Sequence, residues 1–199
     1  MKEAKDNPED ARRTRIIEGA RSVFLAYGYS RATMDDIARA VEISRPAIYL
    51  LFRNKADIFR AVTRAMLEQS HQAAREALQE DLRLGERLFE ALDRGLFRLF
   101  RLIEESPHGE ELVDVNHNIA SDLVADWRTS MVAGFADAIR EEARSRGVRL
   151  EDNGLSAEAL AEMLFDILEG LKAHGLCGTQ AAQSARQFIT LIELALAPR

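Results

Sequence analysis

Residues 42–52 of the 199-residue chain combine side chains that could present a short helix to a polyanion. Ser44 can accept a hydrogen bond from a free amide at a helix N-terminus. Arg45 and Pro46 would then occupy the first helical turn, where proline is tolerated because the amides have no intrahelical partner. An aromatic residue, Tyr49, lies in the amphipathic turn that follows. We interpret this stretch as the probe of a DNA-binding protein.

Other kinds of site chemistry leave no pattern in the sequence. No Gly-rich phosphate loop, Ser/His/Asp order or HExxH metal motif is present. The single cysteine, Cys177, excludes an internal disulfide, and it could sense oxidants only if it were exposed with a lowered pKa. The four histidines have no metal-ligand spacing (His71, His108, His117 and His174). We therefore expect no enzyme, no cofactor and no metal.

Charge is divided unevenly along the chain. The net charge is −6, but residues 12–55 contain nine basic and four acidic residues, so this segment carries +5 and the remainder must carry −11. A basic segment attracts phosphates locally whatever the total charge, which indicates a DNA-binding part on an acidic body. Chance clustering of charges on solvated helix faces is the alternative. The polar N-terminus and the lack of a long apolar run predict a cytoplasmic protein without a membrane span.

The elements that would position the probe are short helices. Apolar residues at helical spacing predict a helix over residues 11–27, ending at Gly28 as a left-handed C-cap. Thr33 can cap a second, short helix, and residues 42–44 turn the chain into the helix that Ser44 caps. Two short helices joined by a tight turn and backed by a longer one form a helix-turn-helix.

The remaining sequence also has helical periodicity and no β pattern. Asn54 with Asp57 would cap a fourth helix that runs to about Gln79. Further helices are expected over residues 85–103, 110–115, 119–147, 156–173 and 179–198. The sequence thus predicts an all-α fold of about nine helices. We expect a helix-turn-helix DNA-binding domain over residues 1–54, with a disordered arm over 1–9, and a second helical domain over 55–199.

Two runs of residues carry a family resemblance. Residues 33–44 and 48–58 closely resemble the N-terminal DNA-binding region of the TetR/AcrR family of transcriptional regulators, within a match from Ile16 to Phe59. The resemblance implies a homodimer that binds double-stranded DNA, with a palindromic operator expected. It also implies C-terminal domains for a small-molecule effector and for dimerisation, with repression usually relieved by the ligand.

The resemblance implies which residues contact DNA. Thr33, Tyr49 and Lys55 would contact phosphates, and Arg45 could span O6 and N7 of a guanine. The full implied set is Thr33, Met34, Ser44, Arg45, Pro46, Ala47, Tyr49 and Lys55.

Two residues depart from the family pattern. Glu42 stands where the family usually has glycine, so the turn either forms without a left-handed glycine or differs in geometry. Leu51 stands where a His or Tyr commonly reaches a phosphate, so we expect that contact to be lost. Pro46 removes a backbone donor and stiffens the start of the helix.

In the second domain the expected sites are mainly apolar. A ligand cavity could be formed by Phe89, Leu92, Leu96, Phe100, His117, Trp127 and Met131, although the apolar members could also be plain core. Arg94, Arg98 and Arg101 could clamp an anion or form a solvated stripe. A two-fold four-helix interface of the last two helices would use Leu160, Leu164, Ile167, Leu171, Phe188 and Ile192, unless that pair packs only on its own core.

The sequence also allows a second class of function. The second domain could be a helical ligand-binding or catalytic module, and the basic N-terminus could dock it to a membrane or a protein. The charge of residues 12–55 is compatible with this hypothesis. The capped three-helix arrangement favours DNA.

Overall fold

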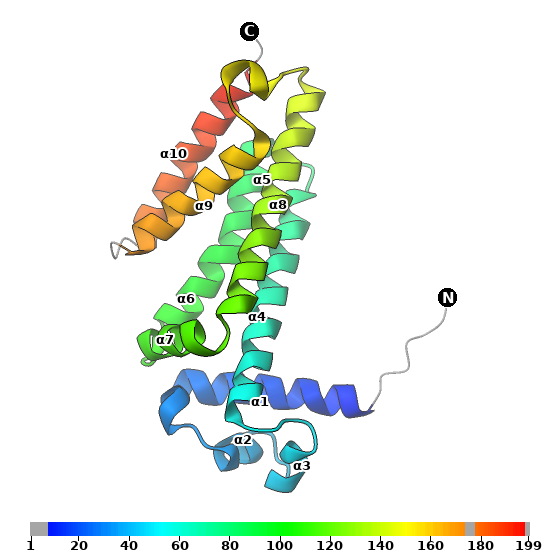
Figure 1. Cartoon of the computed structure of the whole chain (residues 1–199), viewed down its shortest axis with the longest axis vertical. Helices are drawn as coiled ribbons and strands as arrows, with labels where there is room; N and C mark the ends of the chain where they lie inside the picture. Colours follow the sequence, from blue (N-terminus) through cyan, green and yellow to red (C-terminus); the bar gives the residue numbers. More distant parts are fainter. Residues whose placement is uncertain (1–7, 174–177, 198–199) are drawn as a thin grey trace. The chain divides into compact units, whose positions relative to one another are not determined.

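The computed structural model describes residues 8–173 and 178–197, and these ranges are helical without a strand (Figure 1). In chain order the elements are α1 Pro8–Arg31, α2 Met34–Ala40, α3 Arg45–Tyr49, α4 Lys55–Leu78, α5 Leu84–Ala91, the π-helix η1 Leu92–Phe97, α6 Arg98–Glu104, α7 Gly109–Ile119, α8 Ser121–Ser145, the 3-10 helix η2 Leu150–Asn153, α9 Ala157–Ala173 and α10 Thr179–Ala195. Because α5, η1 and α6 are continuous, the described ranges hold nine separate segments of α-helix. The all-α prediction is confirmed.

The chain packs into two compact units. The first unit comprises Met1–Leu67 and Leu102–Val124, and the second unit comprises Glu68–Arg101 and Ala125–Arg199. Each unit has an apolar core of its own. Helix α4 contributes residues to both cores, whereas the core residues of α8 belong to the second. The sequence did not predict that residues 102–124 would join the N-terminal helices. The functional division that it placed at residue 54 stays a prediction.

The core of the first unit explains the arrangement of its helices. Helix α1 packs against α2 and α7, and α2 packs against α3. Ile16, Ala20 and Phe24 lie on one stripe of α1 and are almost completely buried. The ring of Phe24 meets the ring of Phe59 edge to face, with centroids 5.4 Å apart. Burial of a side chain as large as Ile16 or Phe24 contributes roughly 1.5–3 kcal/mol.

The two ends of α1 differ from the sequence-based expectation. The helix begins at Pro8, and proline suits the first position of a helix. The predicted disordered arm over residues 1–9 is therefore wrong at Pro8 and Glu9, which are helical. Residues 1–7 lie outside the described ranges. At Gly28 the backbone leaves the helical region with φ 75° and ψ 168°, and helical residues resume up to Arg31. Gly28 therefore makes a kink, and its ψ differs from that of a left-handed C-cap.

A carboxylate from α7 fills the kink at Gly28. Glu111 Oε1 accepts a 2.7 Å hydrogen bond from the amide of Ser30. A Cβ on residue 28 would overlap the Glu111 carboxylate, and a non-glycine residue would also be strained at this positive φ. The hydrogen bonds from Ser30 lower the pKa of Glu111. The carboxylate thus replaces the helical partner that the Ser30 amide has lost.

The second unit is a bundle in which α10 packs against α9 and α5 (Figure 1). Its core includes Phe135 of α8 and Phe165 of α9, whose rings meet edge to face at 5.3 Å. The carboxylate of Glu193 on α10 accepts a 3.2 Å bond from the amide of Gly85 in the first turn of α5. A carboxylate at a helix N-terminus is favourable because the free amides there carry partial positive charge.

Candidate DNA-binding surface

Helix α2 begins at a complete capping box. The Thr33 hydroxyl accepts a 3.2 Å bond from the Asp36 amide, and the Asp36 carboxylate accepts a 3.0 Å bond from the Thr33 amide. The hydroxyl also lies 2.6 Å from Asp36 Oδ2, to which it donates. These bonds, with that of the Thr33 side chain the largest cause, lower the pKa of Asp36. The predicted cap is present, and the Thr33 hydroxyl proton is already bound within the protein.

The turn between α2 and α3 is made by a glutamate in the left-handed region. Glu42 has φ 55° and is the one non-glycine residue with positive φ in the described ranges. The amide of Ile43 donates back to the Ala38 carbonyl at 3.1 Å, and Ile43 packs against the first core. The left-handed conformation costs an L-residue roughly 1–2 kcal/mol. Of the two alternatives from the sequence, the structure has the left-handed turn without glycine.

Helix α3 is the predicted probe, and it is only five residues long. The Ser44 hydroxyl accepts a 3.4 Å bond from the Ala47 amide, which confirms the expected N-cap. Ile48 is fully buried and fixes the helix on the first core, whereas Arg45 and Pro46 are exposed. The geometry therefore buries one side of α3 and presents its first turn to solvent.

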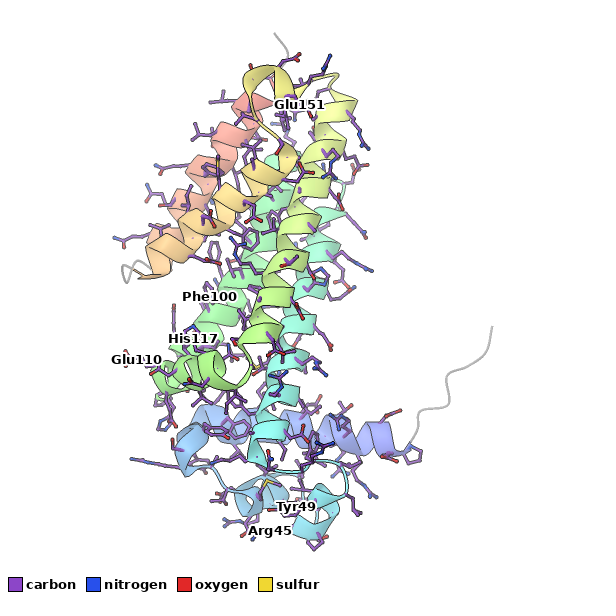
Figure 2. The ribbon with its side chains drawn as sticks, viewed as in Figure 1. Arg45, Tyr49, Phe100, Glu110, His117 and Glu151 are labelled. Atoms are coloured by element: carbon purple, nitrogen blue, oxygen red, sulfur yellow. The ribbon has the colours of Figure 1, made fainter. Side chains whose placement is uncertain are left out.

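The guanidinium of Arg45 has two partners on this surface. Its Nη1 lies 3.3 Å from Asp35 Oδ2, and its Nη2 donates to the Tyr49 hydroxyl at 3.4 Å. The guanidinium carbon lies 5.7 Å from the centre of the Tyr49 ring. Figure 2 labels Arg45 and Tyr49, one helical turn apart on α3. The bond to Tyr49 is the largest cause, followed by the charge of Asp35, of a raised Arg45 pKa.

Lys55 has a different environment from the phosphate anchor that the family resemblance implies. Its ammonium donates to the carbonyls of Tyr29 at 2.6 Å and Ala32 at 2.8 Å, and it lies 3.4 Å from the carbonyl of Ser30. It also lies 4.4 Å from the centre of the Tyr29 ring. Burial lowers the pKa of Lys55, against a smaller opposite effect of Glu111. Three donors meeting three carbonyls tie Lys55 to the end of α1.

Two arginines of α1 hold the helix-turn-helix in the same manner. Arg15 donates to the carbonyl of Val41 at 3.0 Å, and Arg13 donates to the carbonyl of Leu51 at 3.3 Å. The Arg13 guanidinium also lies over the Phe52 ring at 4.4 Å. These carbonyls follow α2 and α3, where helix ends lack intrahelical donors. Part of the basic charge counted in the sequence therefore stabilises the fold.

The structure also changes which neighbouring residues are available to DNA. The Met34 side chain is 8% exposed and belongs to the first core. It is therefore not available for the DNA contact that was predicted for it. Sequence reasoning did not pair Asp35 with Arg45, which lies ten residues away. It also missed Leu50, which is 80% exposed directly after α3. Its apolar side chain, directly after the predicted probe helix, was the signal in the sequence that could have marked it.

The predicted ligand set is divided between the units. Leu92, Leu96 and Met131 are almost completely buried in the second core, and Phe89, Phe100 and Trp127 pack against it while partly exposed. His117 is exposed on α7 in the first unit (Figure 2), and a cavity that it shares with the others stays a prediction. An open groove of about 480 Å³ in the second unit is lined by residues of α4 and α8, including Met131.

Three residues joined by hydrogen bonds, Ser70, Gly95 and Trp127, lie at the π-helix. Ser70 of α4 donates to the Gly95 carbonyl at 2.8 Å, and the Trp127 indole donates to the Ser70 hydroxyl at 3.1 Å. A Cβ on residue 95 would lie 2.9 Å from the Ala74 Cβ, so glycine permits the close approach of η1 to α4. Ser70 is only 6% exposed. π-Helical turns are often found at functional sites.

The arginine stripe that might clamp an anion is partly paired within the second unit. Arg94 forms ion pairs with Glu80 at 2.5 Å and Glu90 at 2.9 Å, and Arg101 pairs with Asp93 at 3.1 Å. These pairs favour the solvated-stripe alternative. In the described ranges no group of three or more His, Cys, Asp or Glu side chains could hold a metal ion, and none of the helices could cross a membrane.

The predicted dimerisation set divides by burial. Leu160, Leu164 and Ile192 are 5%, 0% and 0% exposed in the core of the second unit, so their side chains are not available to a partner. Ile167, Leu171 and Phe188 are half-buried. Other apolar residues of the same helices are exposed, namely Met163 at 45%, Leu191 at 58% and Leu194 at 65%. Cys177 lies outside the described residues.

The fold and this surface define a helix-turn-helix protein. The family description "Bacterial regulatory proteins, tetR family" matches residues 16–62. The chain is 38% identical over 192 residues to the HTH-type transcriptional repressor Rv1474c of Mycobacterium tuberculosis (strain ATCC 25618 / H37Rv), covering 92% of this chain and 91% of that protein. The chain therefore belongs to the TetR family.

Two further comparisons agree with this membership. The chain is 30% identical over 132 residues to the HTH-type transcriptional activator FasR of Mycolicibacterium smegmatis (strain ATCC 700084 / mc(2)155), a match that spans 66% of this chain and only 58% of FasR. A crystal structure of a TetR/AcrR-family transcriptional regulator from Thermobifida fusca YX-ER1 has a TM-score of 0.64 at 19% identity, covering 92% of this chain and 96% of that chain. The second likeness shows the common fold.

Proposed function

We propose that the chain is a DNA-binding transcriptional regulator that reads an operator through α3. The observation that carries this proposal is the Ser44-capped α3, which exposes Arg45 and Tyr49 while Ile48 holds it on the core. In helix-turn-helix proteins such a helix enters the major groove with its N-terminal residues at base edges. The long match to a repressor favours repression. We place the protein in the cytoplasm, where bacterial DNA lies, and propose no catalytic activity.

In this proposal the contacts to DNA differ in kind. Arg45 reads a base edge, with Pro46 and Ala47 beside it, because a guanidinium can bond O6 and N7 of one guanine. Ser44, Tyr49 and the first amides of α2 and α3 face phosphates, and Thr33 would have to share its hydroxyl with Asp36. Lys55 acts through its charge and by holding α1, since its donors meet carbonyls.

Selection of bound sequences from random double-stranded DNA tests the proposal. The wild-type chain should enrich one site, with an affinity that falls steeply as salt rises. Arg45→Ala should lose discrimination at one base pair of each half-site by about 5- to 150-fold, which corresponds to roughly 1–3 kcal/mol. Enrichment of no site, or an equal loss at every base pair in Arg45→Ala, would contradict base reading by α3.

We also propose a homodimer formed by the exposed apolar residues of α9 and α10. Met163, Leu191 and Leu194 would be covered by the same surface of a second copy, because two-fold interfaces are self-complementary. A two-fold dimer also matches a palindromic operator. Leu191→Glu should shift the molecular mass measured by light scattering from dimer to monomer. The exposed Ala125→Glu on α8 serves as the control, and a monomeric wild type would contradict the proposal.

The second unit is the proposed place of a small-molecule effector. The Ser70–Gly95–Trp127 trio gives an otherwise apolar core a hydrogen-bonding point, and ligand sites combine apolar linings with few polar groups. An effector releases DNA only if it binds more tightly to the conformation that does not hold the operator. A thermal-shift screen should find compounds that raise the melting temperature and lower operator affinity. Compounds that stabilise the protein but leave operator affinity unchanged would contradict this role.

A further inference from the structure

We propose that Asp35 is a positioning residue that sets base discrimination by holding the guanidinium of Arg45. The inference rests on the proposed function and names a specificity residue outside the set that the family resemblance implies. Asp35 lies in the first turn of α2, and Arg45 begins α3. The carboxylate therefore joins the supporting helix of the motif to the reading side chain.

The two neighbouring aspartates of α2 have different partners. Asp36 is bound to Thr33 in the capping box and to Arg39, whose Nη2 lies 2.5 Å from Asp36 Oδ1. Asp35 has no part in that cap, and its Oδ2 lies 3.3 Å from Arg45 Nη1. Both side chains of the Asp35–Arg45 pair are more than half exposed, so the pair lies on the surface that would face DNA.

The donors of Arg45 are sufficient for both tasks. A guanidinium has five N–H donors, of which Asp35 takes one and the Tyr49 hydroxyl takes another. Three donors remain, and a guanine needs two of them at O6 and N7. Arg45 can therefore read a base without leaving its partners. Two fixed contacts also reduce the rotamer freedom that a long side chain would lose on binding.

The charge of Asp35 has an effect of the opposite sign on overall affinity. A carboxylate near phosphates repels DNA, so its removal should strengthen sequence-independent binding. The pairing of Asp35 with Arg45 is expected to raise the ratio of affinities between an operator with the preferred base pair and one with another base pair. The two effects can be separated, because charge changes affinity for all sequences whereas positioning changes the ratio between two sequences.

The test uses the full chain and the operator found by selection. The base pair read by Arg45 is defined as the one where Arg45→Ala loses its guanine preference. At that pair, Asp35→Ala should lower discrimination between G·C and A·T at least threefold, while affinity for unrelated DNA stays equal or rises. Asp35→Glu, which keeps a carboxylate, should restore part of the discrimination. Thermal unfolding of each variant shows whether the domain is intact.

Two controls isolate positioning from charge and from folding. Glu18→Gln removes a negative charge from the exposed surface of α1 and should leave the discrimination ratio unchanged. Adding Asp35→Ala to Arg45→Ala should cause no further loss at the defined pair, because the positioned side chain is absent. Unchanged discrimination in Asp35→Ala would overturn the inference, and so would a loss at a different base pair. If the wild type selects no site, the proposed function itself fails.

Discussion

Cations are held in different ways in the two units. In the first unit Lys55, Arg13 and Arg15 donate to backbone carbonyls that lie in the last turn of a helix or just after it. In the second unit Arg128 of α8 pairs with three carboxylates of α9, Glu162 at 2.9 Å, Asp166 at 2.6 Å and Glu169 at 2.7 Å. Arg94 and Arg140 also pair with acids there.

This difference helps to explain how residues 12–55 keep a net charge of +5 although several of their cations are engaged in the fold. A carbonyl has a dipole but no net charge, so it satisfies a guanidinium or ammonium without cancelling its charge. A carboxylate satisfies the donors of the cation and also cancels its charge. The first unit has exceptions in Arg39, Arg45 and Arg60, which pair with aspartates. The carbonyl-bound cations keep their charge, which contributes to the +5 of residues 12–55 and can attract phosphates locally.

Lys55→Met should have the largest effect. It removes the ammonium from the carbonyls of Tyr29 and Ala32 and leaves both without that donor. Hydrogen bonds to charged groups are worth about 1.5–3 kcal/mol, so we expect a destabilisation of about 2–3 kcal/mol in urea unfolding followed by circular dichroism. Operator affinity at low salt should also fall. An unchanged unfolding midpoint would break the comparison.

Arg128→Ala should destabilise the protein less than Lys55→Met does, and it should not change DNA binding. It leaves three neighbouring carboxylates on α9 without their shared cation. Because the pairs are partly exposed, the expected loss is about 1 kcal/mol, and 1 M salt should reduce it. Operator affinity should stay within twofold of the wild type. A salt-dependent loss of operator affinity as large as that of Lys55→Met would contradict the division of the two units.

Glu42→Gly should stabilise the first unit by about 0.5–1 kcal/mol. Glycine adopts the positive φ of this turn without the penalty of an L-residue, although it adds entropy to the unfolded chain. Equilibrium unfolding should show a higher midpoint with an unchanged denaturant dependence. Glu42→Gln keeps the Cβ and should show little change, which separates backbone strain from charge.

The smallest expected effect is the pH dependence of stability that comes from Arg60 and Asp122, one of the ion pairs of the first unit. The hydrogen bonds from Arg60 are the main cause that lowers the pKa of Asp122 from 3.8 to about 2. Since the folded pKa lies below the unfolded value, this stabilisation is present above pH 4 and is lost as the pH falls toward 2. Asp122→Asn should therefore differ most from the wild type near neutral pH and least near pH 2. A difference that stays constant over this range would contradict the pairing.

The starts of three helices were predictable because the signals of an N-cap are local. Thr33, Ser44 and Asn54 each cap the helix that the sequence assigned to them, and the Asp57 amide donates to Asn54 Oδ1 at 2.9 Å. A cap needs a polar side chain within three residues of a free amide. The nine helical segments follow from the same local rules of spacing and termination.

Contacts between distant segments were not predictable from these rules. The positions of Leu160 and Leu164 have the same apolar periodicity whether they face a core or a partner, and the structure buries both. The partners of Lys55 are backbone carbonyls more than twenty residues away, which no residue type in the sequence marks. The packing of α7 on α1 likewise depends on a contact between residues about eighty positions apart.

The bond between Trp127 and Ser70 has a spectroscopic consequence. Trp127 is the single tryptophan of the chain and belongs to the second unit, whereas the three tyrosines, Tyr27, Tyr29 and Tyr49, all belong to the first. Indole emission responds to the polarity around the ring, and the Trp127 N–H donates to the Ser70 hydroxyl at 3.1 Å. The unmodified protein thus has one indole, which can be excited selectively and reports on the proposed effector region without a label, while its phenols all lie in the unit with the helix-turn-helix.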